Sequence, residues 1–418
     1  MQGLYETEWK CAYTPATAME EASRCLLCLD APCSQDCPAG TDPGRFIRSI
    51  RFLNTEGAAE TIRENNPFGA VCARVCPTER YCQRGCSRSG IDRPIDIGGL
   101  QRYATDYEAA INLEVMEPGA DTGKKVAIVG SGPAGLTAAA RLREAGHVVD
   151  VFERRSTPGG MLAHGIPAYR LPDDVVAREI DRIVGLGVTI TCDFEVTSDD
   201  VEGDHCSMRD LLERYDAVLV DPGFQKPFVL PVLKDDPRHV SALEFLDLAR
   251  TSKGTMDLPA NVLVIGGGDV AMDVSTSLKR MGVANVTDVI YEQSCEFLCS
   301  QEELRGAQAA GVTLIDGYVP VEAHDGTVTF KHRVLDATLT ITADLIIGAV
   351  GQRVEVSGLD LDVAMHGNEV ATAGPATKDP RVFVTGDIAQ GDKTVVWAVR
   401  KGKEAAQAID EFLTKGGE

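Results

Sequence analysis

Eight of the thirteen cysteines in this 418-residue chain lie in two short runs near its start. The first run reads CLLCLDAPCSQDCP and the second reads CARVCPTERYCQRGC. Their thiols are Cys25, Cys28, Cys33, Cys37, Cys72, Cys76, Cys82 and Cys86. Loop-sized spacings and a Cys-Pro pair in each run are typical of iron–sulfur proteins, where the last cysteine often serves a neighbouring cluster. The two runs therefore predict two 4Fe-4S clusters and a chain that handles electrons.

Two other uses of clustered thiols match the pattern less well. Disulfide frameworks belong mainly to small secreted domains, whereas this chain is long and begins MQGLYETEWK, which does not resemble a signal peptide. Structural zinc usually takes paired Cys-x2-4-Cys knuckles, and the spacing here is irregular. Zinc stays open as an alternative. We expect the other five cysteines to be ordinary thiols.

A glycine-rich loop, Gly130-Ser-Gly-Pro-Ala-Gly135, follows a predicted strand at residues 125–129. Gly130 allows the tight turn, Gly132 lets the backbone approach a pyrophosphate, and Gly135 permits close helix–strand packing. Phosphates bind at the N-terminus of the helix that follows, where free N–H groups favour anions. The next strand ends at Glu153, which is placed to accept from ribose hydroxyls. These features predict a dinucleotide-binding βαβ unit.

A second such unit begins with a strand at residues 262–265 and continues as Gly266-Gly-Gly-Asp-Val-Ala271. Its second strand ends at Glu292, which would accept from a ribose 2′-OH and repel a 2′-phosphate. Because Gln293 and Ser294 follow, with no Arg or Lys beside them, NAD is favoured over NADP. The predicted nucleotide-binding residues are Gly266, Gly267, Gly268, Asp269, Val270, Ala271, Glu292 and Gly351, the last after a buried strand at 345–350.

Helices are predicted around the cysteines, in residues 1–122. Asp42-Pro43-Gly44 can start a helix, because proline is tolerated in the first turn. Helical spacing then places four apolar residues on one face, and we expect them to pack in a core: Phe46, Ile47, Ile50 and Leu53. A further short helix is expected at 58–63, and turn formers make residues 116–123 a linker.

The last part of the chain predicts a hairpin around Asp325-Gly326, a strand from residue 382, and a helix from about Thr394. Gly386-Asp387 at the end of that strand is a plausible second hold on a flavin. We predict four regions. They are a helical domain with two clusters (1–122), an FAD-binding domain in two parts (123–225 and 351–418), and an NAD(H)-binding domain (226–350).

The composition of the chain limits the kinds of partner that it can bind. A net charge of −22 argues against nucleic acid and anionic membrane surfaces, which both select basic patches. The longest weakly polar run, residues 126–140, is too short to span a bilayer. Charged and apolar fractions of 25% and 44% are those of a soluble globular protein. We therefore expect a cytoplasmic protein.

The order of these motifs resembles the glutamate synthase small-subunit family. Within it, the flavin-carrying subunits of bacterial NAD-dependent dihydropyrimidine dehydrogenases are the most similar. The segments that carry the resemblance include EASRCLLCLDAPCSQDCPAGTDPGRFIRSI, AAETIRENNPFGAVCARVCPTERYCQ, PIDIGGLQRYATD, IGGGDVAMDVS and GDIAQGDKTVVWAVRKGKEAA. The resemblance implies an α/β fold with an N-terminal all-α iron–sulfur domain. Two Rossmann-like nucleotide-binding domains of the glutathione reductase type would follow it.

The resemblance also implies which residues hold the cofactors. One cluster would take Cys25, Cys28, Cys33 and Cys86, and the other Cys37, Cys76, Cys82 and Gln101, which leaves Cys72 free. For FAD it points to Gly130, Gly132, Pro133, Ala134, Gly135, Glu153, Gly160, Met161, Arg170, Gly386, Asp387, Thr394, Val395 and Val396. One departure is Asp221-Pro222, where relatives have a small-residue turn. A carboxylate facing the flavin would disturb its potential, so no role is carried over there.

The implied activity is that of an electron-input subunit. NADH would give hydride to FAD, and single electrons would pass through the clusters to a partner subunit with FMN, which reduces uracil or thymine to the 5,6-dihydropyrimidine. No catalytic acid or base is required in this chain, and a hetero-oligomer is expected. Alternatives are a glutamate synthase small subunit, a generic NADH:ferredoxin-type electron carrier, and a non-catalytic zinc protein.

Overall fold

A computed structural model describes residues 4–197, 205–356, 359, 361, 363–367, 369–371 and 374–415. The chain divides into two compact units, and each is described by itself. Unit 1 comprises Met1–Trp9, His164–Pro172 and Gln225–Arg353, and unit 2 comprises Lys10–Ala163, Asp173–Phe224 and Val354–Glu418. Among the described residues, no helix combines the length and the apolar character needed to cross a membrane.

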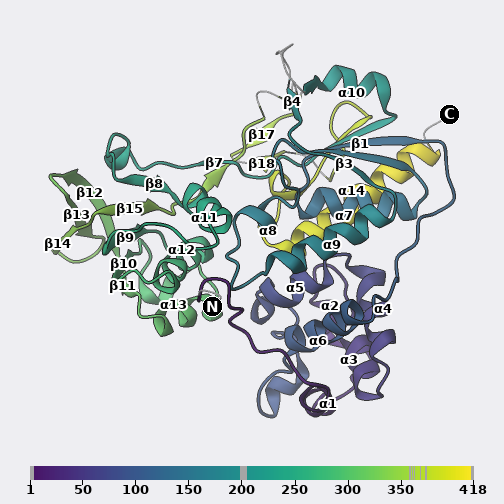
Figure 1. Ribbon diagram of the computed structural model, residues 1–418, viewed down its shortest axis with the longest axis horizontal. Coiled ribbons are helices and arrows are strands. Elements are labelled where there is room, and N and C mark those ends of the chain that lie inside the picture. Colours follow the sequence, from purple (N-terminus) through teal and green to yellow (C-terminus); the bar gives the residue numbers. More distant parts are fainter. Residues whose placement is uncertain are drawn as a thin grey trace. The chain divides into compact units, whose positions relative to one another are not determined.

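The cysteine-rich part of unit 2 is helical, as predicted. Its helices are α1 (Pro15–Ser23), α2 (Pro32–Gln35), α3 (Pro43–Arg51), α4 (Thr55–Asn65), α5 (Gly69–Val75) and α6 (Ile97–Ala110), with short 3-10 turns η1 (Thr78–Arg80) and η2 (Ser87–Gly90). Local side chains start them: Asp42, Asn54 and Asp96 each accept a backbone N–H of the first turn. The cysteines therefore lie on short helices and the loops that join them. Figure 1 shows these helices grouped together.

The apolar face of α3 packs as expected, with one exception. Phe46, Ile47 and Ile50 are buried in the core of these helices. Leu53 is 82% exposed, so the expectation that it packs on the same face is wrong. The helix ends at Arg51, and Leu53 adopts a φ of +62°, which turns its side chain off the helical face.

The first nucleotide fold of unit 2 is a parallel sheet in the order β19-β6-β1-β2-β3. Its strands are β1 (Lys125–Val129), β2 (Val148–Phe152), β3 (Thr189–Thr191), β6 (Ala217–Val220) and β19 (Val382–Val384). The helices are α7 (Pro133–Glu144), α8 (Met161–His164), α9 (Asp173–Gly185), α10 (Met208–Arg214) and α14 (Val395–Lys415), with the turn η6 (Gly386–Ile388). Minor pairs are β4 (Glu195–Thr197) with β5 (His205–Ser207), and β17 (Met365–His366) with β18 (Glu369–Val370). β19 brings the C-terminal region into this sheet, and α14 packs beside α7 (Figure 1).

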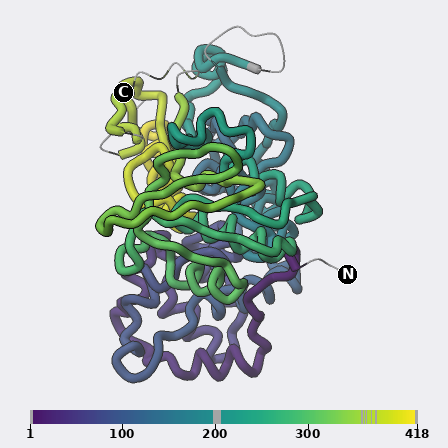
Figure 2. Tube along the Cα trace, turned by 90° about the vertical axis from the view of Figure 1, so that its left-hand side faces the viewer, coloured from purple at the N-terminus to yellow at the C-terminus, as the bar shows by residue number. Residues whose placement is uncertain are grey.

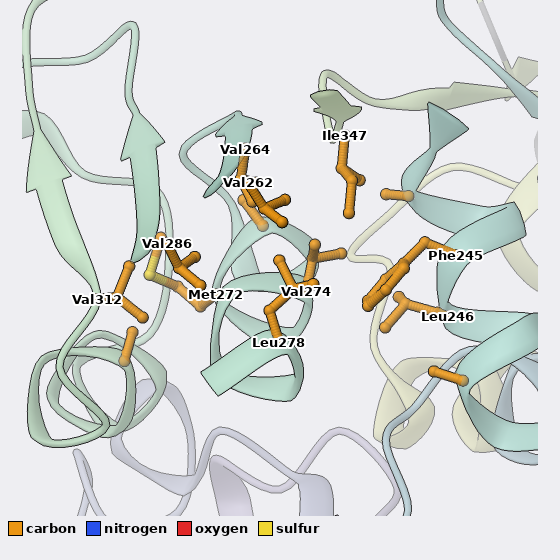
Figure 3. Packing of buried hydrophobic residues seen from close by; sticks show 14 of the residues in the cluster. Phe245, Leu246, Val262, Val264, Met272, Val274, Leu278, Val286, Val312 and Ile347 are labelled. Carbon is orange, nitrogen blue, oxygen red and sulfur yellow. The ribbon is translucent and has the colours of Figure 1, made fainter. Parts of the chain in front are cut away.

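Unit 1 contains a second parallel sheet, in the order β11-β10-β9-β15-β8. Its strands are β8 (His239–Ser241), β9 (Asn261–Ile265), β10 (Asn285–Val289), β11 (Thr313–Ile315) and β15 (Leu345–Gly348). The helices are α11 (Ala242–Thr251), α12 (Asp269–Arg280) and α13 (Gln301–Ala309), with turns η3 (Pro231–Leu233) and η4 (Ser294–Glu296). The short strands β7 (Lys226–Pro227) and β16 (Gln352–Arg353) pair with each other. Side chains from α11, α12, β9, β10 and β15 converge on one core (Figure 3).

The predicted hairpin is also confirmed. It joins β12 (Tyr318–His324) to β13 (Thr327–His332), and β14 (Thr338–Thr342) adds a third antiparallel strand. Figure 2 shows the three strands side by side. Asp325 and Gly326 both have positive φ, as a two-residue type I′ turn requires.

Candidate functional site

The first set of four thiols surrounds one cavity. The residues lining it include Cys25, Cys28, Cys33, Cys86, Leu26, Ile47, Ile95 and Ile97. Burial raises the pKa of Cys25, and burial together with the nearby Cys86 and Cys25 thiols raises the pKa of Cys33 to about 11. Thiolates in apolar surroundings need a metal centre to balance their charge, since coordination deprotonates a thiol. These residues fit a 4Fe-4S cluster, which takes four thiolates.

The second set lies deeper in the helical region. Burial, and the neighbouring thiols of Cys72, Cys82 and Cys37, raise the pKa of Cys76 well above its ordinary value. Burial likewise raises the pKa of Cys82, and the Cys37 and Cys33 thiols raise it as well. Cys37, Cys76 and Cys82 therefore lie within electrostatic reach of one another, and Cys72 belongs to the same neighbourhood.

Gln101 lies on α6 and is buried. Its Nε2 donates to the carbonyl oxygen of Gly69 on α5, 2.7 Å away. This bond fixes the orientation of the amide and leaves Oε1 as the atom a metal could use. Packing of α6 against α5, which carries Cys72 and leads into Cys76, explains how a glutamine distant in sequence comes near the second set.

One tyrosine ties the second set to the first nucleotide fold. Tyr81 stands directly before Cys82, and its hydroxyl donates to Asp392 Oδ2. The same hydroxyl lies 3.4 Å from Thr394 Oγ1, at the start of α14. Burial, and then the bond to Asp392, raise the pKa of Tyr81, so it remains a neutral donor. Sequence inspection missed this contact because its partners are separated by 311 positions.

The first glycine-rich loop has the geometry that a dinucleotide requires. Gly130 has φ +104°, and a Cβ built on it would lie 2.1 Å from the carbonyl oxygen of Asp221. Gly132 caps α7 without a side chain, which lets the backbone at the start of this helix come close to a bound phosphate. Glu153 Oε2 accepts from Ser131 N and Oγ at 3.0 and 2.5 Å, which holds the acidic residue over this loop.

Other predicted flavin residues gather around the same loop. A Cβ on Gly160, which precedes Met161, would lie 3.0 Å from Gly132 Cα. A Cβ on Gly386 would lie 3.4 Å from Ala134 Cβ, so the Gly-Asp turn meets the start of α7, where Pro133 and Ala134 lie. Burial raises the pKa of Asp387. Thr394, Val395 and Val396 form the start of α14 in the same unit. This grouping fits a long dinucleotide such as FAD.

The second loop, in unit 1, has the same design. A Cβ on Gly266 would lie 2.4 Å from the carbonyl oxygen of Ala349, and one on Gly267 would lie 2.5 Å from Glu292 Oε2. Glu292 is therefore over the loop, as Glu153 is over the first one. Asp269, Val270 and Ala271 form the first turn of α12, which Gly268 caps. Gly351, with φ +100°, follows β15. The residues fit a second dinucleotide.

Comparison with known proteins agrees with both the cysteine-rich region and the two nucleotide folds. Residues 5–113 match the family described as dihydropyrimidine dehydrogenase domain II, 4Fe-4S cluster, and residues 124–406 match the pyridine nucleotide-disulphide oxidoreductases. The NAD-dependent dihydropyrimidine dehydrogenase subunit PreT of Salmonella typhimurium is 50% identical over 412 residues, which cover 99% of this chain and 98% of that protein. The chain belongs to the PreT family.

Two further relatives show how far the likeness extends. The glutamate synthase [NADPH] small chain of Escherichia coli is 30% identical over 450 residues, which cover 96% of this chain and 92% of that protein. A thioredoxin reductase structure from T. acidophilum has a TM-score of 0.55 at 20% identity, and it covers 69% of this chain and 98% of its own. That likeness shows the fold alone. The predicted fold class, with an iron–sulfur region before an oxidoreductase fold, is confirmed.

Membership of the PreT family also decides between the uses of the thiols. The thirteen cysteines, all within the described residues, form no disulfide. The matched iron–sulfur family covers both cysteine runs, which makes clusters rather than structural zinc the chemistry of this region. Clusters, FAD and NAD are therefore the cofactors of this oxidoreductase. The ligand of each iron stays a prediction.

Arg170 is the predicted flavin residue that belongs to unit 1 of this PreT-family chain, whereas the others belong to unit 2. It belongs to unit 1, where its guanidinium pairs with Asp273 at 2.7 Å and with Glu303 at 2.6 Å. Both carboxylates are buried, on α12 and α13. Within unit 1 its role is therefore structural, and a role toward flavin stays a prediction.

A basic residue near Glu292 was also missed. Arg333 stacks over the ring of Tyr291 at 4.0 Å, and its Nη1 donates to the Tyr291 carbonyl oxygen. It follows β13, more than forty positions after Glu292, and only the sheet topology brings it beside the acidic residue. The residues that directly follow Glu292 in the sequence, Gln293 and Ser294, gave no indication of this arginine.

Proposed function

We propose that this chain is the electron-input subunit of a dihydropyrimidine dehydrogenase, paired with a partner subunit that carries FMN and the pyrimidine site. The chain would oxidise NADH and deliver electrons to the reduction of uracil or thymine. The observation that carries the proposal is that unit 2 holds both thiol sets and the first dinucleotide loop in one compact body. The name of its Salmonella relative, a subunit of such an enzyme, supports it.

Bound FAD would take hydride from NADH, and the clusters would carry its electrons away singly. We assign FAD to the fold of residues 123–225 and 351–418, and NADH to that of 226–350. Gly132 and the first turn of α7 would hold the FAD pyrophosphate, while Glu153 would accept from its ribose. In the second fold, Glu292 would accept from the NADH ribose. Nothing in this chain needs to move a proton during hydride transfer.

The order of the thiol sets gives the path a direction. Tyr81 joins the second set to Asp392 and Thr394, beside the predicted flavin residues of α14. We infer that electrons reach Cys37, Cys76, Cys82 and Gln101 first. They would leave from the first set, whose cavity opens beside loops with exposed apolar side chains.

Those loops form a surface on which the partner subunit would dock. Its exposed apolar residues are Leu26, Leu29, Phe52, Leu53 and Ile91. These residues come from three segments, 24–29, 51–53 and 88–91, which hydrogen bonds hold together. Arg51 Nη1 donates to Cys25 O at 2.9 Å, and Arg88 Nη1 donates to Arg24 O at 3.3 Å. Leu29 is 94% exposed within the Cys-Leu-Leu-Cys-Leu loop itself. Exposed apolar side chains that gather in one area often mark an interaction site, whereas single scattered ones do not.

The test is anaerobic co-expression of this chain with its genomic neighbour, with the chain alone as the control. We expect about eight irons and one FAD on this chain, FMN on the partner, and NADH-dependent uracil reduction only by the pair. The chain alone should reduce artificial acceptors with NADH. Uracil reduction by the chain alone would contradict the proposal.

A glutamate synthase small subunit is the second candidate, because that relative is 30% identical over nearly the whole chain. Co-purification with a large glutamate-forming partner would favour it, and iron, FAD and NADH oxidation would then be unchanged. In either case we propose that the chain works in the cytoplasm with its partner.

A further inference from the structure

Asp221, which directly follows β6, is a buried carboxylate directed at the start of α7. Its Oδ2 accepts the backbone N–H of Gly135 at 2.7 Å. Gly135 is the third residue of α7, and the capping residue Gly132 has no side chain to make this bond. Asp221 therefore serves as a helix cap supplied from a neighbouring strand.

The carboxylate fills the space where the two flavin-holding segments meet. Its Oδ2 lies 3.2 Å from a Cβ built on Gly132, and its Oδ1 lies 1.9 Å from one built on Gly386. No side chain other than hydrogen could therefore stand at position 386. Asp221 contacts both the loop and the Gly-Asp turn.

The second nucleotide fold shows that this carboxylate is not needed to build such a loop. Ala349 follows β15 as Asp221 follows β6, because Ala349 N donates to Ile265 O and Asp221 N donates to Val129 O. Each residue's carbonyl oxygen packs on the first glycine of its loop. An alanine suffices in one fold, so the acidic side chain in the other calls for a separate explanation.

The charges around Asp221 are mostly negative. Burial, together with the charges of Asp387 and Glu153, raises the pKa of Asp221 to about 7, and the hydrogen bond from Gly135 opposes this rise. Lys401 of α14 opposes this shift, while its Nζ donates to the carbonyl oxygens of Gly386 and Ala389. Lys393 faces Asp387 and pairs with Glu369 at 2.6 Å. A pyrophosphate at the start of α7 would add further negative charge.

We propose that Asp221 takes up one proton from solvent when a dinucleotide pyrophosphate binds at the first loop, so that FAD binding is linked to protonation of this residue. The inference rests on the proposed function, in which that dinucleotide is FAD. One proton moves from water to one carboxylate oxygen, and no electrons are exchanged. Neutral Asp221 still accepts from Gly135 N and no longer repels the phosphates.

The linkage fixes the sign of the pH effect. If binding raises the pKa of Asp221, the affinity for FAD is greatest below about pH 7 and falls as the pH rises through the pKa of the free form. The fall approaches about tenfold per pH unit and stops above the pKa of the complex. Asp221→Asn keeps an acceptor for Gly135 N and removes the charge, so its affinity should not vary across this range.

The experiment measures FAD binding to the full-length apoprotein by flavin fluorescence, from about pH 6 to about pH 9. The wild type should weaken with pH, and Asp221→Asn should not. Asp288→Asn is the matched control. Asp288 is also buried, its pKa is also raised to about 7 by burial, and it is bonded to Ser275 within unit 1. That variant should show the wild-type pH dependence.

Calorimetry of wild-type binding in two buffers of different ionisation enthalpy supplies a second readout, which decides the matter even if Asp221→Asn does not fold. We expect uptake of about one proton near pH 8. FAD binding without proton uptake, or equal pH dependence in the wild type and Asp221→Asn, would overturn this inference and leave the proposed function intact. Failure of FAD to bind at any pH would overturn both.

Discussion

At the scale of single residues, the second thiol set offers four sulfurs and one amide for four ligand positions. Cys72 and Gln101 compete for the last of them. Burial raises the pKa of Cys72 to about 12, although a hydrogen bond from Asn66 opposes this rise. Gln101 is held by Gly69 with its amide nitrogen engaged. The family resemblance assigns the position to Gln101, and only substitution separates the two.

Replacing Gln101 with Ala should remove the second cluster, and iron should fall from about eight to about four per chain, because a ligand position is lost. Cys72→Ser is the matched variant and should keep about eight. Iron, acid-labile sulfide and the electron paramagnetic resonance of the reduced protein measure the outcome. The reverse pattern would make Cys72 the ligand.

Glu292 is expected to set the nucleotide preference of the second fold. In Glu292→Gln, the ratio of kcat/KM for NADH to that for NADPH should fall about tenfold, or about 1.4 kcal/mol, because repulsion of the 2′-phosphate is lost. Glu296→Gln, which changes the charge beside Arg333, is the control and should leave the ratio near its wild-type value. An unchanged ratio in Glu292→Gln would show that Arg333 or the backbone decides the preference.

At the scale of elements, a buried ion network joins the cluster helices to the first nucleotide fold. Arg63 of α4 bonds to Glu108 of α6 and to Glu179 of α9, each at 2.7 Å. Glu179 Oε2 also accepts from Ala70 N at 3.0 Å, at the start of α5. Arg182 of α9 pairs with Glu108 as well. The network fixes α4, α5 and α6 on α9, which keeps the second thiol set close to the flavin fold.

Arg63→Ala should lower the free energy of unfolding by about 3–5 kcal/mol, because it leaves two buried carboxylates short of their cation. Arg45→Ala breaks an exposed pair between Arg45 of α3 and Glu64 of α4 and should cost about 0–1 kcal/mol. Chemical denaturation of the holoprotein gives both values. If Arg63→Ala and Arg45→Ala both lower the free energy of unfolding by the same small amount, Arg182 alone can neutralise the two carboxylates.

At the scale of the whole molecule, an acidic chain presents a local apolar surface around its first cysteine loop. A subunit that only oxidised NADH would have no use for it. The surface is exposed in the isolated chain and would be covered in the assembled enzyme, as the proposed electron path requires.

Replacing both Leu29 and Leu53 with Asp should weaken binding of the partner subunit at least tenfold, since each leucine contributes about 1.5–3 kcal/mol when fully buried. Iron, FAD and NADH-dependent reduction of artificial acceptors should be unchanged. Val334→Asp with Leu335→Asp alters another exposed apolar pair, on unit 1, and serves as the control. Analytical ultracentrifugation of the two subunits measures the effect. Wild-type assembly by the Leu29 and Leu53 variant would place the docking surface elsewhere.

The sequence by itself determined the local structure. Glycine spacing, strand composition and capping residues located β1, β2, β9, the hairpin turn and the starts of α3 and α14 to within a residue or two. The spacing of the two cysteine runs predicted the iron–sulfur clusters. These predictions succeeded because each depends on contacts between near neighbours in the chain, which periodicity and turn chemistry report directly.

Only the tertiary structure decided which distant side chains meet. It directed Asp221 at α7, joined Tyr81 to Asp392, buried Arg63 between Glu108 and Glu179, and paired Arg170 within unit 1. A charged residue looks the same in sequence whether it faces water or a buried partner. Its role depends on sheet order and helix packing, which bring together residues that are tens to hundreds of positions apart.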